Sequence, residues 1–377
     1  MRRWSVDVRD GRSEDDGRDS RPGRPGRPDT GRRHAVCRAG LALAASWCAA
    51  TGIARAGDRA PGAAALPVTP WLGPSDRLID LRDPRQQPLD ERLLRERLAT
   101  TDLLLLGERH DEPEHHVRRG ALLLALARQP AGPAAASAAR QRLGVVAEQL
   151  LQGRQIPSAD AATQGPSALL ARLQAAGFDP RIWGWPLYEP LFDPLDLGRR
   201  DGLAVEFGGA NLPLEQVRRV VREGESALPP ALLALLQAAP LGPVARSRLD
   251  ADLRDSHCGQ MPEARLPGMR LAQRARDAAM WQALAAARQR TDLAVLLAGN
   301  GHVRLDYGVP VLAAAAQPGW RVLSVGFGVV GEPADGPYDL LWQTPGRPAE
   351  DPCVPPPPPS APPSPLPSPL PSARPDA

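Results

Sequence analysis

Two segments of this sequence carry residue types that do chemistry, and each follows a short apolar run. Residues 103–116 read Leu-Leu-Leu-Leu-Gly-Glu-Arg-His-Asp-Glu-Pro-Glu-His-His, so Glu108 and His110 come directly after the run. Residues 293–302 end in Gly-Asn-Gly-His, which places His302 in a similar position. The glycines let the backbone turn sharply after each run. Because sites in α/β proteins form at the carboxyl ends of parallel strands, we expect both segments to contribute to one site.

Other residues extend this set without fixing its chemistry. Glu148 ends a third apolar run, and His257 lies in Asp-Ser-His-Cys-Gly. Two histidines with one or two carboxylates suit a divalent metal, whereas a histidine or tyrosine beside apolar walls suits haem. The residues alone leave both readings open, since a single buried histidine or glutamate is more often a hydrogen-bonded structural residue. If the site holds a metal ion, the predicted ligands are Glu108, His110, Glu148 and His302.

The elements that must position these residues alternate between short apolar runs and amphipathic stretches, which is typical of a mostly parallel sheet covered by helices. The predicted strands are 103–106, 144–148, 202–207, 293–298 and 321–325. The predicted helices are 89–99, 113–127, 166–176, 213–222, 229–238 and 266–288. We therefore predict an α/β fold with a mostly parallel central sheet flanked by helices. Segments within 152–200 and 214–290 carry few strand signals and predict a smaller helical subdomain.

The two ends of the chain have compositions that differ from this core. Residues 1–30 are almost free of apolar side chains and cannot bury enough surface to fold. The apolar run 39–53, with arginines before it and Ala-Arg-Ala after it, predicts a secretory signal. Cys48 offers a lipoprotein signal as the alternative, although a bulky tryptophan precedes it. Residues 354–371 are rich in proline and predict an extended or disordered tail.

The charge distribution and the cysteine content restrict the classes of function that remain. The 46 basic residues are all arginine and are interleaved with 43 acidic ones, so the chain lacks the one-sided basic field of nucleic-acid binding proteins. Export would place the chain in the periplasm or at the membrane-associated cell envelope. Cys258 and Cys353 could form a disulfide in such an oxidising compartment, but the sequence alone does not show that they meet.

Seven motifs in register resemble the ChaN family of haem-binding uptake lipoproteins, over about residues 78 to 330. They are Leu106-Gly-Glu-Arg-His-Asp with His115-His116, Val146-Ala-Glu148, Trp185-x-x-Tyr188, Ala210-Asn-Leu-Pro213, Ser256-His-Cys-Gly259, Gln273-x-x-x-Asp277-x-x-Met280, and Ala298-Gly-Asn-Gly-His-Val-Arg up to Pro310. On this reading, residues 1–56 are a disordered N-terminus with a signal segment, 57–350 a ChaN-like haem-binding domain, and 351–377 a proline-rich tail.

The resemblance implies an exported protein that binds and hands on haem at a tyrosine ligand. Tyr188 is slightly favoured over Tyr307 for that role, and Tyr338 is the third tyrosine of the chain. Homodimers of haem-bearing subunits and envelope transport components are the implied partners. The further residues assigned to the cofactor are Glu108, His110, His257, His302 and Arg304.

A more distant resemblance links the family to the TraB and Tiki proteins and to the erythromycin esterases. There, similar motifs serve hydrolysis, so the alternative is a metal-dependent hydrolase with the four-residue metal set given above. A purely structural envelope protein is the third class. The sequence departs from the family where Leu214 follows Pro213 in place of an expected basic residue, which bears on contacts to the haem propionates.

Overall fold

The computed structural model describes residues 71–129, 141–157, 165–347 and Cys353. The predicted N-terminal segment and signal (1–56), and all of the predicted tail except Cys353, lie outside the described residues. The predictions made for those segments therefore stay predictions. Every described residue belongs to the same compact unit of the chain.

A seven-stranded sheet in the order β1-β7-β6-β2-β5-β3-β4 forms the centre of this unit. All neighbouring strands are parallel except β1, which runs antiparallel to β7 at one edge. This confirms the predicted α/β class with a mostly parallel sheet. The strands are β1 (Arg77–Asp80), β2 (Leu103–Leu106), β3 (Leu143–Leu151), β4 (Val205–Asn211), β5 (Leu293–Leu297), β6 (Val322–Val329) and β7 (Leu340–Thr344).

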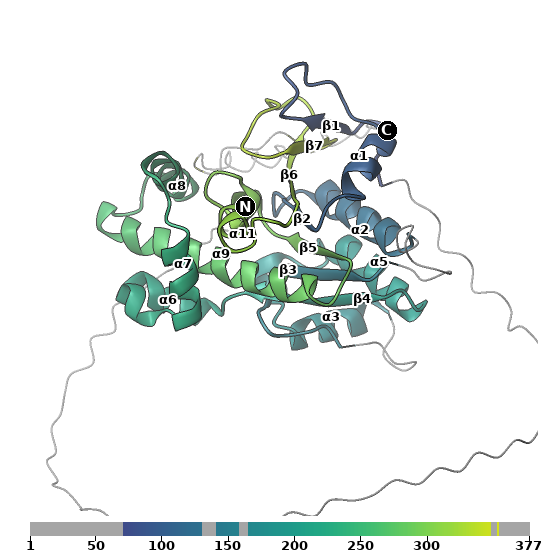
Figure 1. Cartoon of the computed structure of the whole chain (residues 1–377). Coiled ribbons are helices and arrows are strands. Elements are labelled where there is room, and N and C mark those ends of the chain that lie inside the picture. Colours follow the sequence, from purple (N-terminus) through teal and green to yellow (C-terminus); the bar gives the residue numbers. More distant parts are fainter. Residues whose placement is uncertain (1–70, 130–140, 158–164, 348–352, 354–377) are drawn as a thin grey trace, which may run out of the picture. The chain divides into compact units, whose positions relative to one another are not determined.

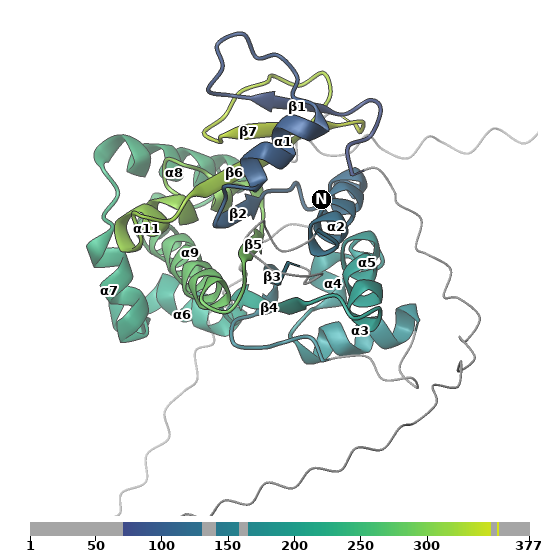
Figure 2. The same cartoon turned by 45° about the vertical axis from the view of Figure 1, so that its right-hand side comes forward.

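Helices cover both faces of the sheet, because its strands are apolar on both sides (Figures 1 and 2). Leu104 and Leu106 of β2 pack into the core on the side of α2 and α5, whereas Leu103 and Leu105 pack on the side of α9 and α11. The helices are α1 (Glu91–Leu98), α2 (Pro113–Ala127), α3 (Pro166–Ala175), α4 (Pro180–Trp183), α5 (Glu189–Arg200), α6 (Leu214–Glu223), α7 (Pro230–Ala238), α8 (Pro243–Ser256), α9 (Leu266–Arg288), α10 (Asn300–Val303) and α11 (Val309–Ala316), with 3-10 turns at Gly224–Ala227 and Glu263–Arg265.

Strand β4 begins and ends later than predicted. The backbone freedom and the small size of glycine explain the difference. Gly202 has a φ of +79° and forms a turn, so the strand starts only at Val205. The strand then continues through Gly208 and Gly209, where the register between β3 and β4 shifts. A Cβ atom on Gly209 would lie 2.1 Å from the carbonyl oxygen of Leu151, so only glycine fits this close approach.

A separate helical subdomain is not confirmed. Helices α6, α7 and α8 all pack on α9, and α9 also covers strands β3, β4 and β5. These helices are therefore continuous with the body of the fold (Figure 2). None of the helices that the structure describes is long and apolar enough to cross a membrane.

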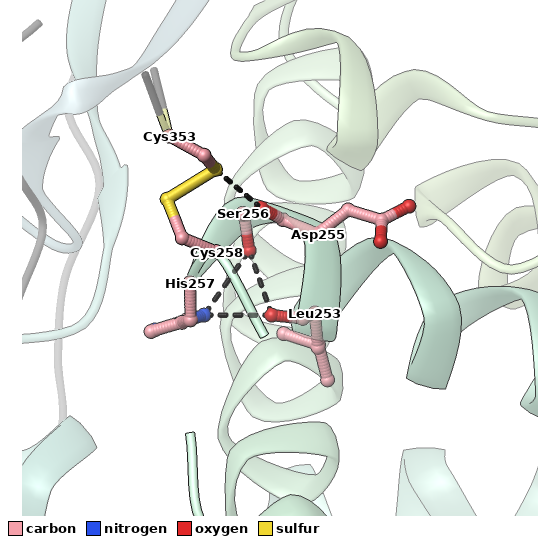
Figure 3. The surroundings of a disulfide bond; sticks show 6 residues. All are labelled: Leu253, Asp255, Ser256, His257, Cys258 and Cys353. Atoms are coloured by element: carbon pink, nitrogen blue, oxygen red, sulfur yellow. Dashed lines mark hydrogen bonds between the residues drawn. A yellow bond between two sulfur atoms is a disulfide. The ribbon is translucent and has the colours of Figure 1, made fainter. Parts of the chain in front are cut away.

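A disulfide joins Cys258, just after α8, to Cys353, which lies 95 positions further along the chain (Figure 3). The sequence offered this pair without showing that the two cysteines meet, and the structure brings them together with a Cα–Cα distance of 5.2 Å. The Sγ atom of Cys353 also lies 3.8 Å from the carbonyl oxygen of Asp255. The bond ties the segment after β7 to the end of α8.

Candidate functional site

The two chemistry-bearing segments meet at the carboxyl edge of the sheet, as the sequence predicts. Strand β5 lies between β2 and β3, so the loops after β2 and β5 are neighbours of the end of β3. The backbone N–H of Asn300 donates to the carbonyl oxygen of Glu108 at 2.9 Å and ties the two loops together. This edge therefore brings Glu108, His110, Glu148 and His302 into one region.

Glu108 is the centre of a buried polar cluster, and its side chain has no exposed surface. Its Oε1 accepts hydrogen bonds from the hydroxyl of Tyr188 at 2.6 Å and from the amide of Gln149 at 2.9 Å. Its Oε2 forms an ion pair with Arg119, a fully buried residue of α2. Burial lowers the pKa of Arg119 to about 10, which leaves the guanidinium charged at neutral pH.

His110 is the exposed member of this cluster, with 42 % of its side chain accessible to solvent. Its Nδ1 lies 2.5 Å from Oε1 of Glu108, and its ring meets Trp183 edge to face with centroids 5.2 Å apart. His116 fixes the loop by bonding the carbonyl oxygen of His110 at 3.2 Å. Burial lowers the pKa of His110, although part of its side chain is exposed.

Glu148 and His302 form a second cluster that is closed to solvent. Nδ1 of His302 lies 2.6 Å from Asp277 of α9, and its Nε2 lies 3.5 Å from Glu148. Glu148 also pairs with Arg276 and accepts a hydrogen bond of 2.6 Å from the backbone N–H of Gly299. Burial opposes both charges, but the mutual attraction raises the pKa of His302, and His302 with Arg276 holds the pKa of Glu148 well below its usual range.

Gly299 separates the two clusters. A Cβ atom at this position would lie 3.0 Å from both Cε1 and Nε2 of His110 and 3.5 Å from a carboxylate oxygen of Glu148. The missing side chain therefore leaves the space that the imidazole of His110 occupies. The backbone of Gly299 has ordinary dihedral angles, so the requirement for glycine here is one of space.

The four residues of the predicted metal set lie at one edge but form two pairs, each with its own partners. Within residues 71–129, 141–157 and 165–347, and at Cys353, no three His, Cys, Asp or Glu side chains are placed so that they could hold a metal ion. Instead, His110 is a partly exposed imidazole hydrogen-bonded to one carboxylate, and His302 is an enclosed imidazole between two carboxylates.

Tyr307 and Arg304, both assigned to the cofactor from the sequence, lie in a neighbouring cluster with Asp252 of α8. The hydroxyl of Tyr307 donates to Asp252 at 2.5 Å, and the guanidinium of Arg304 stacks over the Tyr307 ring at 4.5 Å. Arg304 also makes two hydrogen bonds to Asp306. The hydroxyl of Tyr307 is 3.9 Å from the point where a Cβ on Gly301 would be, so this cluster lies close to the loop after β5.

His257, the remaining predicted cofactor residue, lies at the C-terminal end of α8 beside the disulfide (Figure 3). Its Nδ1 is 2.7 Å from the carbonyl oxygen of Leu253 and 3.2 Å from the hydroxyl of Ser256. The residue is therefore held by its own helix.

Sequence reasoning missed three partners that define the two pairs, namely the buried Arg119 and Gln149 and the half-buried Arg276. Arg119 follows His116 by three positions on α2, which puts both on one helix face, and this spacing was the available signal. Gln149 directly follows Glu148 in β3 and so points to the opposite face of the sheet. Asp277 lies in one of the motifs that resemble the ChaN family, but its contact with His302 was not predicted.

The sequence model of a known protein family, described as "Haem-binding uptake, Tiki superfamily, ChaN", matches residues 94–312, which are more than half of the chain. None of the curated proteins matches this sequence. The matched region contains both pairs at the carboxyl edge and the Tyr307 cluster.

Three solved structures are similar to this chain, and the first of them supports the fold. A structure described as cofacial haem binding to ChaN of Campylobacter jejuni is 17 % identical, with a TM-score of 0.51, and covers 73 % of this chain and 100 % of that one. A Bacillus cereus protein is 14 % identical with a TM-score of 0.35, covering 63 % and 68 % of the two chains. The type III effector HopBA1 is 14 % identical with a TM-score of 0.31, covering 64 % and 86 %. On the strength of the family match, this chain belongs to the ChaN family of haem-binding uptake proteins in the Tiki superfamily.

Proposed function

We propose that this chain binds haem at the carboxyl edge of the sheet, beside His110. Family membership supports haem as the ligand. The observation that carries the location is that His110, with 42 % of its side chain exposed, presents an imidazole between the buried Glu108 and the ring of Trp183. An imidazole or phenolate beside apolar side chains is the type of site that haem proteins use.

Apolar side chains next to His110 support a porphyrin contact. Trp183 packs against both His110 and Tyr188, with ring centroids 5.2 and 5.9 Å apart. Its neighbour Ile182 is 41 % exposed, which is unusual for a large apolar residue of this protein. Burying such surface against the porphyrin stabilises the complex by about 25 cal/mol for each Å² removed from water.

A titration of the full chain with hemin, followed through the Soret band, tests this function. We expect saturable binding with one haem for each chain. Ile182→Glu places a charge on α4 next to Trp183 and should weaken binding by about tenfold, because burying a charge against the porphyrin is unfavourable. Val244→Glu, at a residue of α8 that is 75 % exposed, is the matched control and should leave binding unchanged.

The alternative location is the Tyr307 cluster, and the same pair of variants decides between the two. Val244 belongs to α8, the helix that supplies Asp252 to Tyr307. Weakening by Val244→Glu with no effect of Ile182→Glu would move the haem to that cluster. A wild-type chain that shows no saturable uptake of hemin would refute haem binding altogether.

We also propose that the chain works after export, in the periplasm or at the cell envelope. The signal-like segment 39–53 and the Cys258–Cys353 disulfide support this, because disulfides persist in oxidising compartments. Alkylation of free thiols before and after reduction, on chain recovered from the envelope fraction, should label Cys258 only after reduction. Recovery of the chain from the cytosol with free thiols would contradict the proposal.

A haem-dependent homodimer and envelope transport components are the proposed partners. Support comes from the related Campylobacter jejuni structure, whose description is of cofacial haem binding. Sedimentation of the chain with and without hemin should show a doubling of mass on binding. The metal-dependent hydrolase is not favoured, since the described residues lack a group of side chains that could hold a metal.

A further inference from the structure

We propose that the amino edge of the sheet, where its parallel strands begin, holds a second binding site, in which Arg142, Arg199 and Arg200 bind the phosphate group of a small organic phosphate ester. The site lies at the opposite end of the strands from Glu148 and His302. The inference therefore goes beyond the proposed function and does not depend on it.

A cavity of about 350 Å³ lies where three neighbouring strands begin. Strands β5, β3 and β4 are adjacent and parallel, and residues just before each of them line the cavity. Arg142 precedes β3, Ala204 precedes β4 and Thr291 precedes β5. Helix α5 contributes Arg199 and Arg200, the arginines of its last turn. Ligand pockets of proteins have volumes of about 300 to 1,000 Å³, so this cavity suits a small molecule rather than a macromolecule.

Arginines outnumber acids in the described wall of this cavity, which contains three arginines and one acid, Glu206. Glu206 is hydrogen-bonded at 2.9 Å to Arg290, which is not part of the wall. Arg142 pairs with Asp292 at 3.2 Å, but 61 % of its side chain is exposed, so its guanidinium can reorient towards a ligand. The excess of positive charge in the wall favours an anionic ligand.

Arg199 and Arg200 share the acids near them with a third arginine, Arg172. Asp196 of α5 accepts a hydrogen bond from Arg172 at 2.5 Å but lies 3.7 Å from Nε of Arg200, which is beyond hydrogen-bond range. No described residue accepts a hydrogen bond from this buried Nε, although Asp193 attracts the guanidinium. Burial and repulsion from Arg172 lower the pKa of Arg199 against the attraction of Asp196. An anion in the cavity would therefore stabilise a positive charge that the neighbouring acids balance only in part.

A phosphate ester fits this wall better than other common anions. A carboxylate has two oxygens and one charge, which match a single guanidinium, whereas a phosphate ester has three terminal oxygens and up to two negative charges at neutral pH. It can therefore bond two or three arginines at once. The buried side chains of Leu203 and Val205 add apolar surface for the organic part of the ester.

Calorimetric titration of the full chain with glycerol phosphate tests this site, in a phosphate-free buffer of low ionic strength that leaves charge interactions unscreened. We expect saturable binding of one molecule for each chain. Arg199→Gln and Arg200→Gln should each weaken binding by about tenfold, because each variant loses a charged hydrogen bond to the ester. Ala204→Glu should abolish binding, since it places a negative charge at an exposed position of the wall.

Arg219→Gln is the matched control, because Arg219 of α6 pairs with Glu223 away from the cavity and its loss changes the net charge by the same amount. Equal weakening in this variant would overturn the proposal, since the effect would then belong to the overall charge. So would unchanged binding in Ala204→Glu, or a wild-type chain that shows no saturable binding. Should the variants in α5 fail to fold, Arg142→Gln changes a mostly exposed side chain and should also weaken binding.

Two further titrations identify the class of ligand. Succinate should bind more weakly than glycerol phosphate, and equal or tighter binding of succinate would overturn the assignment of a phosphate. Vesicles that contain phosphatidic acid should not sediment the chain, and binding to these vesicles without binding to the soluble ester would overturn the small-molecule ligand. Hemin uptake should be the same in the wild type and in Ala204→Glu, so failure of this site is distinguishable from failure of haem binding.

Discussion

The two glutamate–histidine pairs at the carboxyl edge contain the same residue types but differ in how far the imidazole is exposed to solvent. In the pair Glu108 and His110, the carboxylate is enclosed but 42 % of the imidazole is exposed. In the pair Glu148 and His302, only 5 % of the imidazole is exposed, and Asp277 faces its other nitrogen. Among the residues that the structure describes, the first imidazole has hydrogen-bond partners at Nδ1, whereas the second has an acid at each of its two nitrogens.

The difference lies in the second acid, Asp277. A histidine between two carboxylates is stabilised as a cation, which is a poor ligand for a metal because it has no lone pair. For His110, burial outweighs the attraction of the nearby acids and lowers the pKa, which favours the neutral ring. The residue types and their spacing from the strand ends are alike in the two pairs, so the role of each histidine is decided by what the helices α2 and α9 pack against it.

Removal of the second acid should have the largest effect on stability. Asp277→Asn leaves His302 with an uncompensated part of its charge in the core and should lower the free energy of unfolding by about 3–5 kcal/mol. The spectrum of bound hemin should be unchanged in the molecules that remain folded. Chemical denaturation checks the first expectation and hemin titration the second.

The matched variants for this experiment are Asp292→Asn and His110→Asn. Asp292 pairs with Arg142 at the surface, so its loss should cost less than about 1 kcal/mol. His110→Asn should also have a small effect on stability while it removes the hemin spectrum. Equal effects of Asp277→Asn and His110→Asn on stability and on hemin binding would contradict the different roles given to the two pairs.

The free energy of unfolding should decrease toward acid pH because of one histidine and toward higher pH because of another. His115 is buried and its pKa is lowered to about 4, so the unfolded chain takes up a proton first as the pH falls from about 6.5 to 4. This costs about 3 kcal/mol at the acid end. The pKa of His302 is raised, so its stabilisation is full below about pH 6.5 and is lost as the pH rises through the folded value.

Thermal unfolding of the haem-free chain between pH 4 and 9 measures both limbs. His115→Gln should make the acid limb shallower, because burial also lowers the pKa of His116 to about 4 and that residue contributes the rest. His302→Gln should flatten the limb above pH 6.5. Wild-type slopes in both variants would show that other groups control the pH dependence. A flattened acid limb in His302→Gln would contradict the raised pKa assigned to that residue.

The sequence predicted the elements whose signals are local. Helices α2 and α9 have the predicted bounds, since each opens with a proline in its first turn and keeps a helical apolar pattern. Five strands were found from their apolar runs, but the edge strand β1 and its partner β7 were missed, because polar residues such as Asp80 and Gln343 shorten their apolar runs.

The candidate site was predictable only in part, for a physical reason. Strand ends and glycines in the sequence indicated that Glu108 and His302 would approach one edge. Nothing local indicates that Tyr188 would donate to Glu108 from 80 positions away, or that Arg119 would be a buried cation. These contacts depend on how α2 and the start of α5 pack against the sheet, so the sequence alone could not predict them.

A substitution at Gly299 tests the difference between the two glutamate–histidine pairs with the smallest change in structure. Gly299→Ala adds one methyl group 3.0 Å from the His110 ring and 3.5 Å from Glu148. The ring of His110 is at the surface and can move, whereas Glu148 is held by Arg276 and His302, so the imidazole should yield. We expect a stability loss of about 1 kcal/mol and a hemin affinity weakened about fivefold.

Gly301→Ala is the matched control, because the nearest atom to a Cβ there is the Tyr307 hydroxyl at 3.9 Å. That variant should leave hemin affinity and spectrum unchanged if the haem lies beside His110, and should disturb both if the haem lies at the Tyr307 cluster. A large stability loss in Gly299→Ala with normal hemin binding would instead place Gly299 with the enclosed pair. The two alanines, only two positions apart after β5, thus show which side of Gly299 the ligand occupies.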